Sequence, residues 1–124
     1  MQPNPSGSKG RVLVVEDDAV TAMALRTILR RSGWEVEVAA TVAEAMRLLH
    51  NSPSAIVLDL MLPDGDGAMI LEFVRKSKAA IRVAVTTGAS DPDRLARLAE
   101  LSPDLVLRKP IDLGALLRGL NPSG

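Results

Sequence analysis

Short apolar runs alternate with amphipathic segments along most of this 124-residue chain. Each run is rich in β-branched residues or leucine and is too short for a helix, so the runs predict strands. The predicted strands are residues 11–16, 35–39, 55–59, 81–86 and 104–108. Strands that alternate with helices are typical of a parallel sheet with helices on both faces. The pattern therefore predicts an α/β fold with five strands and five helices.

Three of the predicted helices carry signals at their first residues. Thr41 followed by Glu44 is a capping box, and Asp91 before Pro92 pairs an N-cap with a favoured first helical residue. Asp112 is placed to cap the last helix in the same way. These signals predict where the second, fourth and fifth helices begin.

The composition fits one globular domain. Hydrophobic residues make up 47% of the chain and charged residues 24%, which is an ordinary balance for a sequence that folds alone. Residues 1–10 are rich in Pro, Gly, Ser and Asn and predict a flexible tail. We therefore expect the folded domain to span residues 11–120, with a second short tail at 121–124.

Charge and cysteine content exclude several classes of function. Fifteen Lys and Arg offset fifteen Asp and Glu, so no net field attracts nucleic acid or an anionic membrane. The absence of cysteine excludes disulfides, thiol catalysis and cysteine-ligated zinc. No apolar stretch typical of a signal peptide or membrane span occurs at the N-terminus. We expect a cytoplasmic protein that binds neither nucleic acid nor membrane directly.

Reactive side chains stand at the ends of the predicted strands. The carboxyl ends of parallel strands meet at one edge of the sheet, where such folds bind ligands, so these side chains are expected to lie close together. The first strand ends in Glu16, Asp17 and Asp18, the third in Asp59, the fourth in Thr86 and Thr87, and the fifth is followed by Lys109. Acids, a hydroxyl group and a lysine therefore converge at this edge.

The acids at this edge predict a bound divalent cation. Neighbouring carboxylates repel one another strongly unless a cation compensates them. Mg²⁺ prefers oxygen ligands and commonly lies between carboxylates and a phosphate, and Mn²⁺ is the alternative. The absence of nearby His and Cys argues against zinc. With its charge partly neutralised by the metal and by Lys109, Asp59 is best placed to attack the phosphorus of a phosphoryl donor.

Some of these residues also have ordinary structural interpretations. Asp18 is more readily explained as the N-cap of the first helix and is not assigned to the site. An isolated lysine is usually a surface residue, but Lys109 stands before a proline at a strand end. Side chains alternate along a strand, so only one of Thr86 and Thr87 can face the site. Gly88, which lets the backbone turn close to a bound anion, favours Thr87.

Four segments together resemble the receiver domains of response regulators, the phosphoacceptor domains of two-component signalling. The segments are VLVVEDD at 12–18, DLMLPDGDG at 59–67, TG at 87–88 and KP at 109–110. Their order and spacing make the set highly specific, and the resemblance covers residues 11–120. It implies a doubly wound, flavodoxin-like sheet with the strand order 2-1-3-4-5.

The resemblance also implies the metal ligands and the phosphoacceptor. Glu16 and Asp17 would hold Mg²⁺, and Asp59 would accept the phosphoryl group while also binding the metal. The backbone carbonyl of Met61 would complete the protein ligands, with water and the phosphoryl group filling the remaining positions.

The remaining implied roles concern the phosphoryl group and the loops around it. Thr87 would bond a phosphoryl oxygen and reorient on phosphorylation, and Lys109 would pair with the phosphoryl charge. The residues implied to shape the loops are Pro63, Gly67, Gly88 and Pro110. A cis peptide bond is expected before the last of these prolines.

The chain departs from the family pattern at Val106. Many receivers carry an aromatic residue three positions before the lysine, and its rotamer reports the phosphorylation state. Here valine stands at that position and the chain has no Tyr. We hypothesise that Thr87 and the backbone of the fourth helix carry the signal instead, which amide chemical shifts can test.

The leading functional interpretation is a phosphorylation switch. A sensor histidine kinase or a histidine phosphotransfer protein would donate the phosphoryl group to Asp59. The face formed by the fourth helix, fifth strand and fifth helix would then control a downstream target protein that the sequence does not identify. The domain would be a signalling protein and no conventional enzyme, limited to self-directed phosphotransfer and autodephosphorylation. We expect a monomer or a weak dimer.

Three alternatives remain open from sequence. One is a receiver segment of a larger response regulator or of a hybrid histidine kinase. A second is a degenerate receiver used only for protein binding, which the retained acids, threonine and lysine disfavour. The third is a Mg²⁺-dependent phosphatase of the haloacid dehalogenase type with Asp59 as nucleophile, but Met61 stands where such enzymes need a second aspartate.

Overall fold

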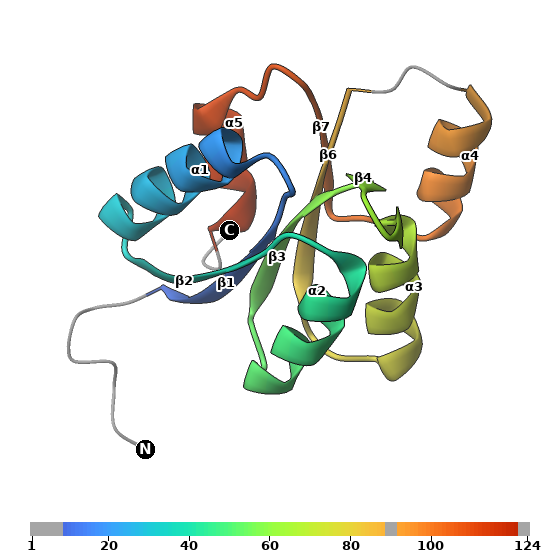
Figure 1. The fold of residues 1–124 in the computed structure, drawn as a ribbon, viewed down its shortest axis with the longest axis horizontal. Helices are drawn as coiled ribbons and strands as arrows, with labels where there is room; N and C mark the ends of the chain where they lie inside the picture. Colours follow the sequence, from blue (N-terminus) through green and yellow to red (C-terminus); the bar gives the residue numbers. More distant parts are fainter. Residues whose placement is uncertain (1–8, 89–91, 122–124) are drawn as a thin grey trace.

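The computed structural model describes residues 9–88 and 92–121 and shows one parallel sheet between two layers of helices (Figure 1). The strands of the sheet are β1 (Gly10–Val15), β2 (Trp34–Ala39), β3 (Ala55–Asp59), β6 (Arg82–Thr87) and β7 (Leu105–Arg108). They are parallel and lie in the order β2-β1-β3-β6-β7. Since β6 and β7 are the fourth and fifth strands of this sheet, the predicted order is confirmed.

The helices cover both faces of the sheet. The elements outside the sheet are α1 (Ala19–Arg31), α2 (Val42–Leu48), the 3₁₀ helix η1 (Leu49–Asn51), α3 (Ala68–Ser77), α4 (Pro92–Glu100), α5 (Leu113–Leu120), and the short strands β4 (Met61–Leu62) and β5 (Gly65–Asp66). Figure 1 shows α1 and α5 on one face and α2, α3 and α4 on the other. None of the described helices is long and apolar enough to cross a membrane.

Alternate residues of the central strands pack on opposite faces of the sheet. Leu13, Ile56 and Val83 belong to the apolar cluster that includes residues of α2, α3 and α4. Val14 and Val57 belong to the cluster that includes residues of α1 and α5. All five side chains are at most 1% exposed. Strands buried on both faces need apolar residues at successive positions, which explains why they appear in the sequence as unbroken apolar runs.

Side-chain caps fix the beginnings of three helices. Asp18, Thr41 and Asp112 each accept the amide hydrogen three residues further on, at 3.0 to 3.1 Å. The ordinary role predicted for Asp18 is therefore confirmed, together with the predicted starts of α2 and α5. The fourth helix begins at Pro92 as predicted, while its expected cap, Asp91, lies outside the described residues.

Local details differ from the sequence-based expectation. The Glu44 carboxylate accepts from the amide of Ala40 at 3.0 Å, one residue before the Thr41 amide that a capping box would engage. The first strand begins at Gly10, inside the predicted tail, because that residue already pairs with the start of β2. The fourth predicted strand continues to Thr87, which pairs with the end of β7.

Asp104 joins the start of β7 to β6 and α3. Its amide donates to the Val83 carbonyl at 2.9 Å, and its Oδ2 accepts from the Val83 amide at 2.7 Å. The same oxygen lies 2.9 Å from Nη2 of Arg75, which also donates to the carbonyls of Ile81 and Ser102. Burial acts to raise the pKa of Asp104, but the Val83 amide and the Arg75 guanidinium together hold it below its usual value.

We expect Asp104→Ala to lower the free energy of unfolding by about 1 to 3 kcal/mol, because the buried Val83 amide loses its acceptor. Asp104→Asn keeps an acceptor but removes the charge. Because the folded pKa is lowered, the charge stabilises the fold above the ordinary pKa of aspartate, and this contribution is lost as the pH falls through the folded value. Urea unfolding at several pH values should show the gap between wild type and Asp104→Asn closing in acid. A gap that is independent of pH would contradict this account.

Candidate functional site

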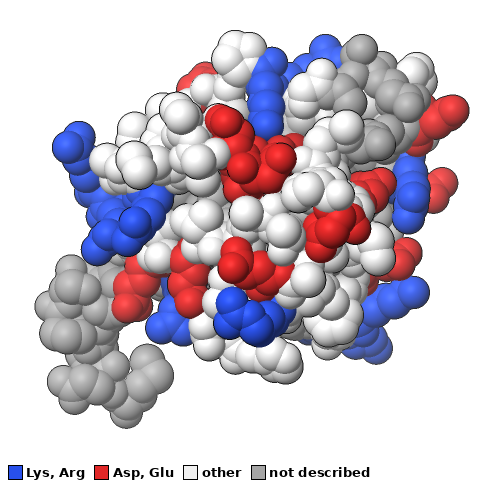
Figure 2. Space-filling view, viewed as in Figure 1, with Lys and Arg blue, Asp and Glu red and all other residues white. Residues whose placement is uncertain are grey.

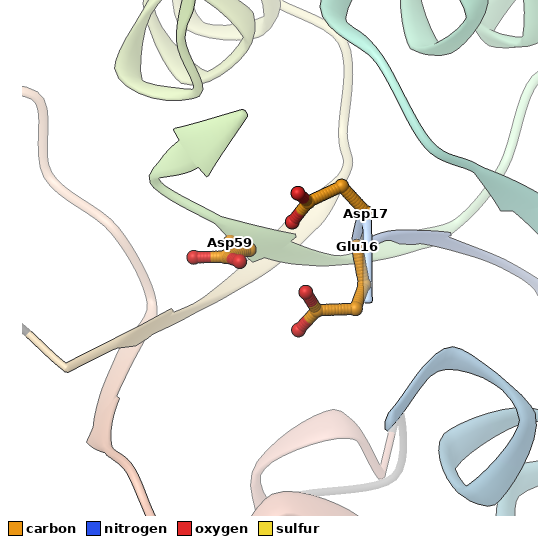
Figure 3. A group of neighbouring side chains, drawn as sticks. All are labelled: Glu16, Asp17 and Asp59. Atoms are coloured by element: carbon orange, nitrogen blue, oxygen red, sulfur yellow. The ribbon is translucent and has the colours of Figure 1, made fainter. Parts of the chain in front are cut away.

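Three acidic side chains meet at the carboxyl-terminal edge of the sheet. Glu16 and Asp17 directly follow β1, Asp59 is the last residue of β3, and these two strands are paired neighbours. One carboxylate oxygen of each acid lies within 4.8 Å of those of the other two. Figure 3 shows the side chains of Glu16 and Asp17 turned toward Asp59. In Figure 2, acidic atoms gather in the upper centre of the view, over the ends of these strands.

Lys109, which immediately follows β7, reaches two of these acids. Its Nζ lies 3.2 Å from Oε1 of Glu16 and 3.2 Å from Oδ2 of Asp59. Glu16 is 3% exposed and Asp59 is 4% exposed, whereas Asp17 is open to solvent. The amide of Lys109 donates to the carbonyl of Thr87 at 2.9 Å, which holds the end of β7 against β6. The predicted convergence of acids and lysine is thus present in the fold.

The pKa shifts of Glu16 and Lys109 show how the charges balance. Burial raises the pKa of Glu16, and the neighbouring Asp59 raises it further. Hydrogen bonds from the Asp18 amide and from Lys109 act to lower this pKa, but it stays above its usual value. Burial acts to lower the pKa of Lys109, but its bonds to Glu16 and the charge of Asp59 leave it raised. A carboxylate paired with its own lysine would have a lowered pKa. The pKa of Glu16 is raised instead, chiefly because its side chain is buried, and also because Asp59 adds negative charge while sharing the same ammonium group.

This excess of negative charge fits a hard divalent cation. Within residues 9–88 and 92–121, these acids form the one group of three side chains placed to hold a metal ion. All three offer oxygen, and the exposed side at Asp17 leaves room for water. Mg²⁺ binds with few carboxylates and retains several waters, so the donor set suits it.

Both oxygens of the Asp59 carboxylate have hydrogen-bond donors. Oδ1 accepts from the amide of Met61 at 3.1 Å, and Oδ2 accepts from Lys109 at 3.2 Å. Thr86 pairs with Asp59 across the sheet, and Thr87, the last residue of β6, is fully buried. These contacts fix the orientation of the Asp59 side chain at the strand end.

The expected cis peptide bond precedes Pro110, and it joins this residue to the lysine of the site. Among the prolines expected to shape the loops, Pro63 lies exposed between the two strands of the β4–β5 hairpin (residues 61–66). This hairpin follows Asp59 and Leu60 and was not anticipated from sequence.

Gly67 closes the base of the β4–β5 hairpin. Its amide donates to the carbonyl of Leu60 at 2.8 Å. A Cβ atom at Gly67 would overlap the carbonyl oxygen of Asp59 and lie 3.1 Å from Cα of Leu60. Glycine is therefore needed here for close backbone approach, next to the phosphoacceptor candidate.

Gly88 has a different environment from Gly67. A Cβ atom at Gly88 would meet no atom of the described residues within 4 Å. The described part of the fold therefore does not require glycine at this position. The expected approach of its backbone to a bound anion stays a prediction.

Sequence reasoning missed Asp64, which lies at the turn of the hairpin. Its Oδ1 accepts from the amide of Val42 at 2.7 Å, and its Oδ2 accepts from the amide of Ala43 at 3.1 Å. These are the first two residues of α2, 22 and 21 positions earlier in the chain. No local pattern links an acid in a turn to so distant a helix, so only the tertiary structure reveals the contact.

A family model for the response regulator receiver domain matches residues 12–121. The chain belongs to this family. Receiver domains are signalling domains of two-component systems, and they partner with histidine kinases. The resemblance noted in the sequence is confirmed, and Glu16, Asp17, Asp59, Thr87 and Lys109 all lie within the matched residues.

Curated relatives of this receiver domain are transcriptional regulators. The transcriptional regulatory protein PrrA of Mycobacterium tuberculosis is 38% identical over 108 residues, which cover 86% of this chain and 46% of PrrA. The TorCAD operon transcriptional regulatory protein TorR of Escherichia coli O157:H7 is 32% identical over 108 residues, with the same two shares. This receiver domain therefore spans less than half the length of these relatives.

Solved receiver structures match the fold along most of the chain. The non-phosphorylated HemR receiver domain of Leptospira biflexa is 32% identical with a TM-score of 0.79, covering 89% of this chain and 90% of HemR. A response regulator of Burkholderia pseudomallei is 25% identical with a TM-score of 0.81, covering 91% of this chain and 67% of that chain. That Burkholderia structure contains a phosphorylated aspartic acid, a calcium ion and citrate.

We expect Gly67→Ala to lower the free energy of unfolding by about 1 to 3 kcal/mol, because the added methyl group must displace backbone atoms of β3. Gly88→Ala is the matched control, since its methyl group meets no described atom within 4 Å. Thermal denaturation of both variants without metal would compare them with the wild type. Equal melting temperatures for the two variants would contradict the packing argument.

Proposed function

We propose that this receiver domain accepts a phosphoryl group on Asp59 from a phosphorylated histidine of a sensor kinase or phosphotransfer protein. The observation that carries the proposal is the position of Asp59, which shares Lys109 with Glu16 at 3.2 Å from each and lies beside Asp17. A carboxylate whose charge is compensated in this way can approach an anionic donor.

The proposed transfer is a displacement at phosphorus. A carboxylate oxygen of Asp59 forms a bond to phosphorus, and the bond between phosphorus and the donor nitrogen breaks. The donor imidazole takes up a proton and leaves in its neutral form. Later attack of water on the phosphorus releases phosphate and restores the carboxylate, which is the proposed autodephosphorylation.

The site residues divide into two proposed groups. Glu16, Asp17, Asp59 and the carbonyl of Met61 hold the metal, which is Mg²⁺ or Mn²⁺. This cation would offset the charge that accumulates on the phosphoryl oxygens. Thr87 and Lys109 bind the phosphoryl group, and the loops shaped by Pro63, Gly67, Gly88 and Pro110 hold these groups in place.

The proposed output surface consists of α4, β7 and α5. The curated relatives named above are transcriptional regulators, so the partner controlled by this surface is a further domain or protein that acts in such regulation. The domain itself is proposed to bind no nucleic acid and no membrane, in keeping with its zero net charge. Its own oligomeric state is proposed to be monomer or weak dimer.

Incubation with acetyl phosphate and Mg²⁺ should add the mass of one phosphoryl group to the wild-type chain. Asp59→Asn removes the nucleophile while keeping the size of the side chain, so this variant should gain no mass. Chelation of divalent ions should also prevent labelling of the wild type. Intact-protein mass spectrometry provides the measurement. Equal labelling of Asp59→Asn would show that another residue is the acceptor, whereas an unlabelled wild type would favour a receiver that only binds partners.

Phosphorylation is proposed to act on the output surface through Thr87 and the backbone of α4. Position 106, in β7, is 41% exposed. It is occupied by valine, so no aromatic side chain is available there to change rotamer. We expect beryllofluoride, a phosphoryl mimic, to shift the amide resonances of Thr87 and α4 in NMR spectra. A Val106→Ala variant should show the same shifts, whereas Thr87→Ala should lose those in α4. Unchanged α4 resonances in the wild type would contradict this route.

A further inference from the structure

The acid at the hairpin turn connects the phosphoacceptor loop to α2. Asp64 uses one carboxylate oxygen for the Val42 amide and the other for the Ala43 amide, at 2.7 and 3.1 Å. Thr41 serves the third residue of the same helix by accepting from the Glu44 amide at 3.0 Å. Two separate side chains therefore cap one helix, and only Asp64 belongs to the loop that follows Asp59.

The contact is charge-assisted and lies at the surface. The amides of Val42 and Ala43 lower the pKa of Asp64, so the side chain is an anion at neutral pH. Hydrogen bonds to a carboxylate are stronger than those between neutral groups. Because Asp64 is exposed, its replacement leaves no buried group unsatisfied in the core.

The β4–β5 hairpin gains little stability from its own strand pairing. Each of its strands has two residues, paired as Met61 with Asp66 and Leu62 with Gly65. A two-stranded hairpin of this size is marginal in water without further support. At its base the Met61 amide bonds to Asp59, and at its turn Asp64 bonds to α2. Figure 1 shows the hairpin near one end of α2.

We propose that Asp64 is a positioning residue for the metal and phosphoryl site, which it serves by fixing the hairpin that carries Met61. This inference rests on the proposed function, in which the carbonyl of Met61 is a metal ligand. The Asp64 carboxylate bonds to amides of α2 and acts on the site only through the hairpin. It limits the movement of the hairpin from the end opposite to Asp59.

Titration of the metal-free protein with Mg²⁺ alone, followed by the amide resonances of Asp17 and Met61 in NMR spectra, tests this role. We expect Asp64→Ala to raise the Mg²⁺ dissociation constant about 10-fold, the effect usual for residues that orient metal ligands. Without metal, the Met61 amide should also exchange its hydrogen faster in this variant, because the hairpin opens more often.

Thr41→Ala is the matched control. It removes a cap from the same end of α2 and leaves the hairpin contact in place, so its Mg²⁺ affinity and Met61 exchange should equal those of the wild type. Asp64→Asn keeps one of the two acceptor oxygens and loses the charge, so its affinity should lie between those of the wild type and Asp64→Ala. Equal weakening in Asp64→Asn and Asp64→Ala would show that charge alone matters and would overturn the positioning role.

The remaining outcomes separate this inference from the proposed function. Equal Mg²⁺ affinity in the wild type and Asp64→Ala would overturn the positioning role and leave the proposed metal site intact. Equal weakening in Asp64→Ala and Thr41→Ala would also overturn it, because the effect would then come from α2 as a whole. A wild type that binds no Mg²⁺ would overturn both the metal site and the role of Asp64.

Discussion

One ammonium group shared by two buried carboxylates is the interaction on which this site depends. Glu16 and Asp59 each lie 3.2 Å from Nζ of Lys109, and Asp17 adds a third acid at the solvent edge. Without Lys109 the two buried carboxylates would lose the cation that they share, so the lysine stabilises the metal-free fold. One ammonium group cannot compensate all three acids, and burial together with the charge of Asp59 keeps the pKa of Glu16 raised. The same shortage of positive charge that limits stability makes the edge attractive to a divalent cation.

The parallel sheet makes this concentration of charge possible. The first strand supplies Glu16, the central strand supplies Asp59, and an edge strand leads into Lys109. These residues are up to 93 positions apart in the chain. Strand cores buried on both faces hold the strand ends in register, so the energy of the apolar clusters keeps the acids together against their repulsion. The apolar core thus supplies stability, and the repulsion between the acids at the edge of the sheet offsets part of it.

Much of the fold and site follows from sequence because its signals are local or depend only on topology. Apolar runs predicted the five strands, and a cap such as Asp18 requires only its own next turn. The convergence of Glu16 and Asp59 needed one general rule about parallel strands. The β4–β5 hairpin and the contact of Asp64 with α2 could not be predicted, because they depend on how the segment between β3 and α3 packs against a helix much earlier in the chain. For Gly67, the motif indicated glycine, but only the structure gave the steric reason.

The carboxylate of Asp59 bonds to two separate parts of the molecule. Its Oδ2 faces Lys109 at the end of β7, and its Oδ1 faces the Met61 amide at the base of the hairpin. A change of charge or an added group on this carboxylate would alter both contacts, because Lys109 pairs with its charge and the Met61 amide is fixed in the backbone. A chemical event at Asp59 would therefore act directly on the lysine and on the hairpin, in addition to the route through Thr87 that we propose.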